Sequence, residues 1–181
     1  TSCASRKKIN GDSNASKDSE MGKNEEDLDN SYLVLSDTQQ DIVKKNNAFA
    51  LRLFNKVTDM ESKVISPMSV SYLMGMLANG ADGITQQEIL KAIGCEGVSV
   101  NDLNELYKAM LLHANHQDKQ TTVNIANYIA VNKNFKLNKN FSQQVSDSYQ
   151  AGIESLDFTS SKSTDRINGW CKEKTNGMIP R

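Results

Sequence analysis

The chain has 181 residues, with 21 Lys and Arg against 22 Asp and Glu and a formal net charge of −1. This length is sufficient for one domain with a hydrophobic core, or for part of a larger domain. The balanced charge excludes the basic surface of a nucleic-acid-binding protein. No apolar run approaches the ~20 residues that a membrane-spanning helix requires.

Residues 1–36 are predicted to form a disordered tether. Small polar and charged residues dominate this segment and its apolar residues are isolated, so it has no face with which to pack. It opens with Thr-Ser-Cys-Ala, which is similar to the end of a bacterial lipobox. That similarity predicts lipidation of Cys3 after removal of a signal peptide. The alternative is that Cys3 has no such role.

Cys95 and Cys171 are the other two cysteines, and an odd number of distant cysteines is no disulfide framework. They are either two partly buried thiols or one bridge.

The first predicted helix covers residues 37–57, with Asp37 as its N-cap. Its inward residues recur at spacings of three and four, and they are Ile42, Asn46, Phe49, Leu53 and Val57. We expect Asn46, near the buried face, to bond from the helix to a loop. Beyond a polar loop, residues 63–65 are predicted to end a buried strand.

The second predicted helix begins at Ser66, whose hydroxyl is expected to accept a backbone N–H, and Pro67 suits its first turn. Gly80 is expected in the left-handed conformation at its end. Four residues at helical spacing are predicted to form its apolar stripe: Val70, Leu73, Met74 and Leu77. The small residues Gly75 and Ala78 widen this stripe.

A third helix is predicted to begin with a capping box from Thr85 to Glu88. Ile84 and Ile89 occupy the two positions of a hydrophobic staple, and Gly94 is expected to end the helix.

A fourth helix follows at about residues 102–113, and His113 and His116 lie at its end with Asp118 close behind. No third ligand comes at a metal-site spacing. We therefore expect solvent-facing imidazoles at a helix end, with no metal and no cofactor.

Residues 121–131 alternate in hydrophobicity and carry apolar residues on both faces, which predicts a central strand covered on both sides. Asn138 is expected to cap a short helix, and residues 153–158 to form a second strand. A final helix is predicted to open at Ser163 or Thr164 and to stop at Gly177. Trp170, on the same face as Ile167 and Cys171, is expected to pack.

Four motifs occur in order along these elements. They are Ser-Pro-x-Ser-Val at residues 66–70, Met-x-x-x-Gly-Ala at 76–81, Gly-x-Thr-x-x-Glu-Ile at 83–89, and Ile-Asn-x-Trp-x-x-x-x-Thr-x-Gly-x-Ile at 167–179. Together they resemble the serpin family.

The resemblance implies an α+β serpin fold for residues 37–181, covering helices A–F with strands 6B, 2A and 1A. A whole serpin is about twice as long, so the sheet is expected to be completed by a C-terminal part, held as a second chain. A trypsin-like protease could cut after Arg181, in a surface connection.

The resemblance also implies a non-enzyme that inhibits proteases as a suicide substrate. A serine protease, or in a second class a cysteine protease, forms an acyl-enzyme with the reactive loop, which then inserts into sheet A. The scissile bond lies outside this chain. No nucleophile–base motif or phosphate loop argues for catalysis.

Three residues match the family's "shutter", which holds the strands of sheet A closed: Ser66, Ser69 and Asn168. The alternatives are that Ser66 is only the N-cap of its helix and that Asn168 is a helix residue that faces solvent. The fourth helix carries Asp102, Glu105 and Lys108 without a basic stripe, so we expect no glycosaminoglycan site.

Two rival hypotheses remain. One is a non-inhibitory serpin, which differs in a loop hinge outside this chain. The other is a lipid-anchored surface binding module. The tail and lipobox resemble the miropin-like serpins of Bacteroidota, which implies secretion across the inner membrane and a cell-envelope location as an outer-membrane lipoprotein.

Overall fold

A computed structural model describes residues 33–57, 62–114 and 123–180 of the chain. The chain divides into two units, Thr1–Asn30 and Ser31–Arg181, and the first lies outside the described residues. The described elements are α1 (Asp37–Val57), α2 (Pro67–Asn79), α3 (Gly83–Ala92), α4 (Val100–Ala114), β1 (Asn127–Asn132), α5 (Lys139–Tyr149), β2 (Ala151–Leu156) and α6 (Ser161–Lys174).

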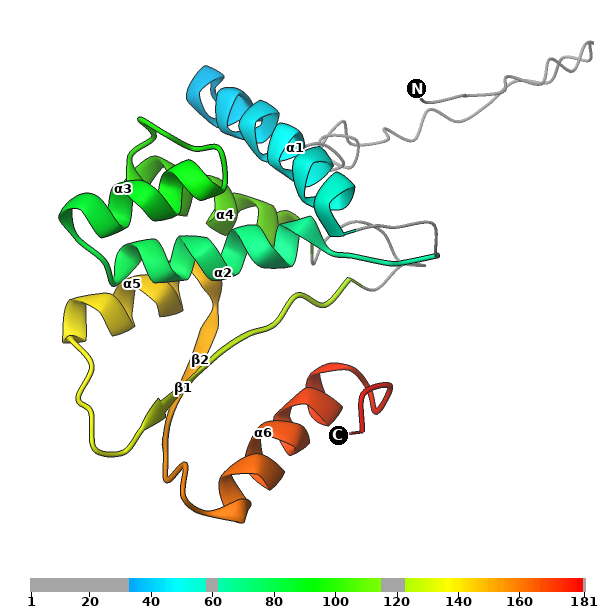
Figure 1. The fold of residues 1–181 in the computed structure, drawn as a ribbon, viewed down its shortest axis with the longest axis vertical. Coiled ribbons are helices and arrows are strands. Elements are labelled where there is room, and N and C mark those ends of the chain that lie inside the picture. The colour runs from blue at the N-terminus through cyan, green and yellow to red at the C-terminus, as the bar shows by residue number, and fades with distance from the viewer. Residues whose placement is uncertain (1–32, 58–61, 115–122, 181) are drawn as a thin grey trace, which may run out of the picture. The chain divides into compact units, whose positions relative to one another are not determined.

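Helix α2 lies at the centre of a layer of five helices and contacts α1, α3, α4 and α5 (Figure 1). The fully buried side chains come from α1, α2, α4 and α5 and from the segment that follows α3. The largest are Tyr72, Tyr107, Tyr149, Ile42, Ile93, Leu103, Leu106, Leu111, Val145 and Cys95. Burial of this apolar surface is the main stabilisation of the helical layer.

The predicted apolar stripe of α2 is only partly correct: Gly75 and Ala78 are buried and Val70 and Met74 pack against the core, but the two leucines do not. Leu73 and Leu77 are 51% and 50% exposed, whereas Tyr72, Gly75 and Met76 are buried. Helix α2 is apolar on nearly all sides, so its sequence does not identify which face packs against α4 and α5. Among the described residues, the Leu73–Leu77 face remains exposed.

Two parallel strands form the described sheet. Strand β1 pairs with β2 from Asn127 opposite Ala151 to Asn132 opposite Leu156, and α5 lies in the crossover between them. A parallel pair requires such a crossover connection. Figure 1 shows α6 lying beside these two strands.

The predicted strand boundaries need correction. Residues 123–126 are described but lie outside β1, residues 121–122 lie outside the described residues, and β2 begins two residues before the predicted residue 153. Every residue of β1 is only partly buried, so within the described part this strand is not covered as predicted. Residues 63–65 form no strand, and Val64 is fully exposed, because no described segment pairs with them.

Several helix ends follow their sequence signals. Ser66 accepts a hydrogen bond from the backbone of Ser69 as the N-cap of α2, and Asn138 caps α5. Gly94 has φ +78° and follows α3, where the N–H of Cys95 donates to Leu90. This is the six-to-one bond of a Schellman motif, as a left-handed glycine there predicts. Gly177, with φ +82°, lies just after α6.

Other helix ends differ from prediction. Ser36, not Asp37, caps α1, because Ser36 and Gln39 bond reciprocally to each other's backbone N–H groups. Helix α3 begins at Gly83, where the Asp82 carboxylate accepts the Gly83 N–H at 2.7 Å. The predicted capping box from Thr85 to Glu88 therefore lies inside the helix. Ile84 is 75% exposed, so it does not form the predicted hydrophobic staple.

Two further end assignments were wrong for reasons visible in the packing. Gly80 has φ −96°, which is not the left-handed conformation expected from the sequence. A glycine is needed there for packing instead, because a Cβ would lie 3.1 Å from the Phe141 ring. Helix α6 begins at Ser161 with Ser160 as its cap, because the Ser163 hydroxyl instead donates to the Asp157 carbonyl at 2.6 Å.

Candidate functional site

Two serine hydroxyls meet at the start of α2. The Oγ atoms of Ser66 and Ser69 lie 2.8 Å apart, and the Ser66 Oγ also accepts the N–H of Ser69 at 3.3 Å. The same atom of Ser66 therefore caps the helix and bonds to its neighbour. Both side chains are exposed within the described part of the chain.

The serine pair lines a cavity of about 510 Å³ between α2, the segment entering β1, and α6. Helix α2 contributes Met68 and Tyr72 in addition to the serines. Helix α6 contributes Trp170, Cys171 and Lys174, and residues 124–127 form a further wall. The structure therefore brings Ser66 and Ser69 close to the same helix, α6, that carries Asn168.

Asn168 is not part of this cavity. It is partly buried on α6, and no hydrogen bond joins its side chain to Ser66 or Ser69 among the described residues. The proximity of all three shutter residues, predicted from the resemblance, stays a prediction.

Helix α6 is fastened to the sheet by aromatic stacking and hydrogen bonds. The Trp170 and Tyr128 rings stack with centroids 4.9 Å apart and planes at 29°. The Asn124 side chain donates to the Lys174 carbonyl at 3.0 Å. Trp170 thus packs, as predicted, and does so against β1.

Glu154 connects this helix to both strands. Its carboxylate accepts the Tyr128 hydroxyl at 2.8 Å and pairs with Arg166 of α6 at 2.9 Å. The bonds from Tyr128 and Arg166 lower the pKa of Glu154. Sequence reasoning missed this cluster, although the alternation of β1 places Tyr128 and Ala130 on one face and the register pairs Ala130 with Glu154.

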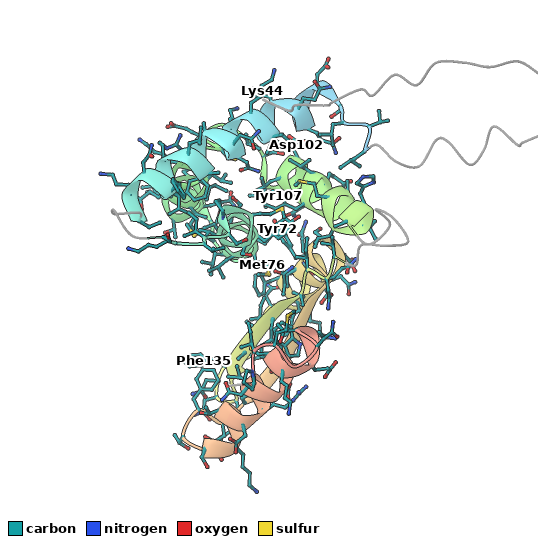
Figure 2. The ribbon with its side chains drawn as sticks, turned by 90° about the vertical axis from the view of Figure 1, so that its right-hand side faces the viewer. Lys44, Tyr72, Met76, Asp102, Tyr107 and Phe135 are labelled. Carbon is teal, nitrogen blue, oxygen red and sulfur yellow. The ribbon has the colours of Figure 1, made fainter. Side chains whose placement is uncertain are left out.

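Three buried tyrosines, one each from α2, α4 and α5, form a cluster in the core. Tyr72, Tyr107 and Tyr149 contact one another edge to face, with centroid separations of 4.7, 6.3 and 5.9 Å. Figure 2 shows Tyr72 and Tyr107 between α2 and α4. Such edge-to-face pairs add stability beyond their buried area.

The hydroxyls of these tyrosines differ in their partners. Tyr107 bonds to Asn46 of α1, and Tyr149 donates to Asn104 at 2.7 Å. The Tyr72 hydroxyl is buried and has no partner among the described residues, and burial raises its pKa to about 12.

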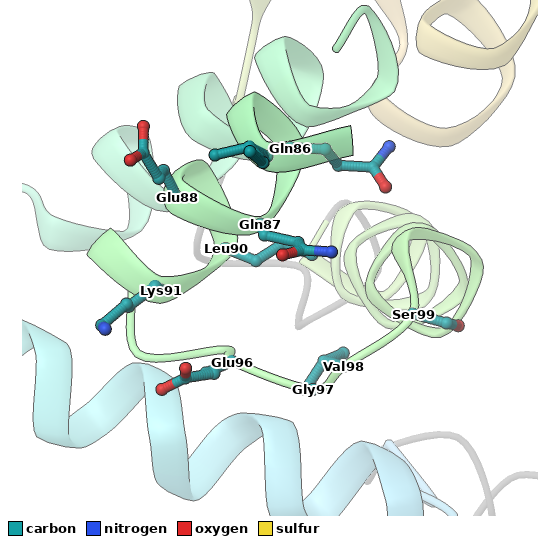
Figure 3. A pocket seen from close by; sticks show the side chains of 10 residues that line it. Gln86, Gln87, Glu88, Leu90, Lys91, Glu96, Gly97, Val98 and Ser99 are labelled. Carbon is teal, nitrogen blue, oxygen red and sulfur yellow. The ribbon is translucent and has the colours of Figure 1, made fainter. Parts of the chain in front are cut away.

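A second cavity, of about 500 Å³, lies between α3 and the segment that leads into α4 (Figure 3). Exposed charges from Glu88, Lys91 and Glu96 surround it, and Leu90 is its buried residue. It brings together no nucleophile and base, so the charges are those of a solvated surface.

The thiols of Cys95 and Cys171 are free, which settles the alternative left open by the sequence against a bridge. Cys95 is buried and its thiol donates to Asn46 Oδ1 at 3.6 Å, and burial raises its pKa. Asn46 thus bonds from α1 to the segment after α3, as predicted for a helix-to-loop contact.

Two candidate sites fall partly or wholly outside the structure. His116 and Asp118 lie outside the described residues, as does Cys3 with the tail to residue 32, and His113 is partly exposed on the last turn of α4. Within the described ranges, no group of three His, Cys, Asp or Glu side chains could hold a metal ion. None of the helices in those ranges is both long and apolar enough to cross a bilayer.

A family model described as Serpin (serine protease inhibitor) matches residues 44–181. The chain belongs to the serpin family. The α+β serpin fold predicted from the sequence is confirmed, for a largely helical N-terminal portion with a small sheet. The family's description is of an inhibitor rather than of a catalyst.

Relatives and solved structures agree with this assignment. Iripin-1 of Ixodes ricinus is 33% identical over 140 residues, which cover 74% of this serpin chain and 36% of Iripin-1. Serine protease inhibitor 42Dd of Drosophila melanogaster is 29% identical over 129 residues, covering 71% and 35%. The thermophilic serpin Tengpin in the latent state superposes with a TM-score of 0.71 at 32% identity, covering 82% of this chain and 39% of Tengpin.

The serpin chain spans well under half the length of these relatives. The relatives come from animals such as a tick, a fly and a frog, and none of these matches supports the narrower assignment to Bacteroidota lipoproteins.

Proposed function

We propose that this chain is the N-terminal part of a serpin that inhibits serine proteases as a suicide substrate. In that mechanism the protease forms an acyl-enzyme with a reactive loop supplied by the rest of the serpin. The cut loop inserts as a strand into the sheet to which β1 and β2 contribute. Cysteine proteases are a second target class under the same chemistry.

The observation that carries the proposal is the sheet with its covering helix. Among the described strands β1 pairs only with β2, so its other edge carries backbone groups able to accept another strand. Helix α6 is attached to this sheet through Trp170 and through the Arg166–Glu154 pair. A hydroxyl pair, Ser66 with Ser69, faces α6 across one cavity.

Insertion of a strand between β1 and a neighbouring strand requires the sheet to open first. Among the described residues, the contacts that hold α6 include one stacked ring pair and the polar bonds of Arg166 and of the Lys174 carbonyl. Exposed ion pairs such as Arg166–Glu154 contribute little to stability, because solvent screens them.

The remainder of the serpin could complete the sheet either as a second, separate polypeptide or as part of one longer chain. Intact mass distinguishes these two arrangements. Measured under native and then denaturing conditions, a nicked serpin gives a complex that separates into this chain and a second polypeptide. A cooperative melt from this chain alone, with no second polypeptide, would contradict the proposal that its sheet is completed by the remainder of a serpin.

Inhibition is tested on the full-length serpin, meaning this chain together with the remainder of its domain. It is incubated with trypsin-like, chymotrypsin-like, elastase-like and papain-like proteases. The expected result is a protease–serpin band that survives denaturing electrophoresis, because the trapped acyl-enzyme is covalent. A protease variant lacking its nucleophile is the matched control and should give no band.

Cleavage of the full-length serpin by these proteases without any stable band would overturn the inhibitory proposal. That result would leave the non-inhibitory serpin.

We further propose lipidation at Cys3, on the similarity of Thr-Ser-Cys-Ala to a lipobox. It would anchor the serpin at the cell envelope through the lipid alone. Expression of the natural precursor with a labelled fatty acid should label the wild type and not Cys3→Ala. A labelled mutant, or an unlabelled wild type, would refute it.

A further inference from the structure

Phe135 is exposed on an ordered turn that follows β1. The strand ends at Asn132, and the Phe135 side chain is 72% exposed. The turn is held by the N–H of Phe135, which donates to the Asn132 carbonyl at 2.9 Å, and by the Asn132 side chain, which accepts the N–H of Asn134 at 3.0 Å. A single exposed apolar side chain is ordinary on a protein surface, so its neighbours decide whether it marks a contact site.

The turn after β2 lies beside the turn after β1. Because the two strands are parallel and in register, both end at the same end of the sheet, where the N–H of Lys133 donates to the Leu156 carbonyl at 2.8 Å. Figure 1 shows the chain leaving both strands at this end. Phe158, in the turn after β2, is 53% exposed. Two phenylalanine rings are therefore exposed at one end of the described sheet.

Lysines flank Phe135, and no acidic residue is close to them in sequence. Lys133, Lys136 and Lys139 are all exposed, and no Asp or Glu occurs from residue 119 to residue 146. Of these three lysines, only Lys133 forms an ion pair within the described ranges, with Asp157 at 2.6 Å. A chain whose net charge is close to zero thus carries local positive charge at this end.

We call these five side chains the basic-aromatic patch, and they are Lys133, Phe135, Lys136, Lys139 and Phe158. Aromatic rings are favoured at the level of lipid headgroups, and lysines there bind anionic headgroups while their aliphatic stems lie along apolar surface. An acidic peptide would match the charge, but anchor residues of a peptide are usually held in pockets. None of the five side chains lines either cavity described above, which favours a lipid surface over a peptide.

We propose that the basic-aromatic patch is an interaction surface for membranes that contain anionic lipids. Phe135 and Phe158 enter the headgroup layer, and Lys136 and Lys139 bind the lipid phosphates. This contact orients the serpin on the membrane and is separate from anchoring through a lipid on Cys3. It requires neither the reactive loop nor the trapping of a protease.

The test uses the full-length serpin carrying Cys3→Ala, so that no lipid anchor contributes to binding. This parent protein is sedimented with vesicles of phosphatidylcholine alone and with vesicles of phosphatidylcholine and phosphatidylglycerol. We expect binding to the anionic vesicles only. The binding should weaken as salt is added, because salt screens exposed charges.

Two changes in the patch should weaken this binding. Lys136→Gln combined with Lys139→Gln should lower the affinity about 30-fold, because each lysine near an anionic surface changes it about fivefold. Phe135→Ser should lower the affinity several-fold, because binding to the interface scales with the apolar area that is buried there.

Two matched controls lie elsewhere and should bind as the parent does. Lys44→Gln combined with Lys56→Gln removes the same charge from exposed positions of α1, and Figure 2 shows Lys44 far from Phe135. Ile84→Ser removes an apolar side chain that is 75% exposed on α3.

Absence of binding to the anionic vesicles would overturn the proposal. An equal loss of affinity in the α1 lysine control would do so too, because it would show a general charge effect. Tighter binding to poly-glutamate, unchanged by Phe135→Ser, would assign the patch to acidic polypeptides instead. A larger fall in Tm for Phe135→Ser than for Ile84→Ser would show that the rest of the serpin covers the ring, which also contradicts the proposal. Failure to trap a protease bears only on the proposed function.

Discussion

Asn79 of α2 and Asn104 of α4 are joined by a reciprocal pair of amide hydrogen bonds. Each Nδ2 donates to the other residue's Oδ1, at 2.9 and 2.8 Å. Asn79 also donates to the Gly75 carbonyl, and Asn104 also accepts the hydroxyl of Tyr149. One amide pair thus satisfies polar groups of three helices in the core.

Asn104→Ala should lower the free energy of unfolding of the full-length serpin by about 3 kcal/mol, because it removes both bonds to Asn79 and leaves the buried Tyr149 hydroxyl without its acceptor. Chemical denaturation measures the change. The matched control is Gln144→Ala, which removes an exposed amide bond to Asn101 and should cost little. Equal losses for the two variants would contradict a special role for the amide pair.

Gly75→Ala and Gly169→Ala should have opposite effects, although both glycines lie inside helices. A Cβ on Gly75 would lie 2.5 Å from the Tyr149 hydroxyl and 3.1 Å from the Tyr107 ring, so overpacking should cost about 1 to 3 kcal/mol. A Cβ on Gly169 meets nothing within 4 Å, and the gain in helix propensity should stabilise α6 by about 1 kcal/mol. Melting temperatures of the two full-length variants give the signs, and a stabilising Gly75→Ala would contradict the close packing of the tyrosine cluster.

The two thiols should differ in reactivity. Cys95 is fully buried with a raised pKa, whereas Cys171 is partly exposed. Iodoacetamide should therefore modify Cys171 in the native full-length serpin and Cys95 only after unfolding, because the thiolate is the reactive form. Mass spectrometry of the cysteine peptides follows each site. Cys171→Ser is the control and should leave Cys95 protected; a peptide pair linking Cys95 to Cys171 would contradict the free thiols.

Asp157 should titrate well below an ordinary aspartate. Hydrogen bonds from Lys133 at 2.6 Å and from Thr159 hold its pKa at about 2, against 3.8 without them. A carboxyl with a lowered folded-state pKa stabilises the fold above its unfolded pKa, and this contribution is lost as the pH falls through about 2. Lys133→Met should move the NMR titration midpoint of Asp157 upward. Lys136→Met removes the same charge nearby and should leave it unmoved; equal shifts would show a general charge effect.

The sequence predicts the elements of this fold well because their signals are local. Ser66 and Asn138 cap helices through bonds to residues two or three positions away, and Gly94 ends α3 through its own backbone conformation. The caps of α1, α3 and α6 were misassigned among neighbouring polar residues. The other failures concern partners distant in sequence. Gly80 accommodates Phe141, the buried face of α2 is chosen by α4 and α5, and residues 63–65 have no described strand to pair with.

The candidate site divides along the same line. The motif around Ser66 and Ser69 predicts a hydroxyl pair, and its Oγ atoms are within bonding distance because three residues make nearly one helical turn. The Glu154 cluster and the unpaired Tyr72 hydroxyl depend on the strand register and on helix packing. A single sequence contains no pairing information of that kind.

The stacked pair of Trp170 and Tyr128 has a practical consequence for spectroscopy. Trp170 is the single tryptophan of this chain, and its ring lies against β1 at the joint between α6 and the sheet. Its emission is therefore expected to change when that joint loosens, so this chain carries an optical probe beside the strands of the sheet that the reactive loop is proposed to enter. Under the proposed function, this tryptophan allows the separation of α6 from β1 to be timed without attaching a label.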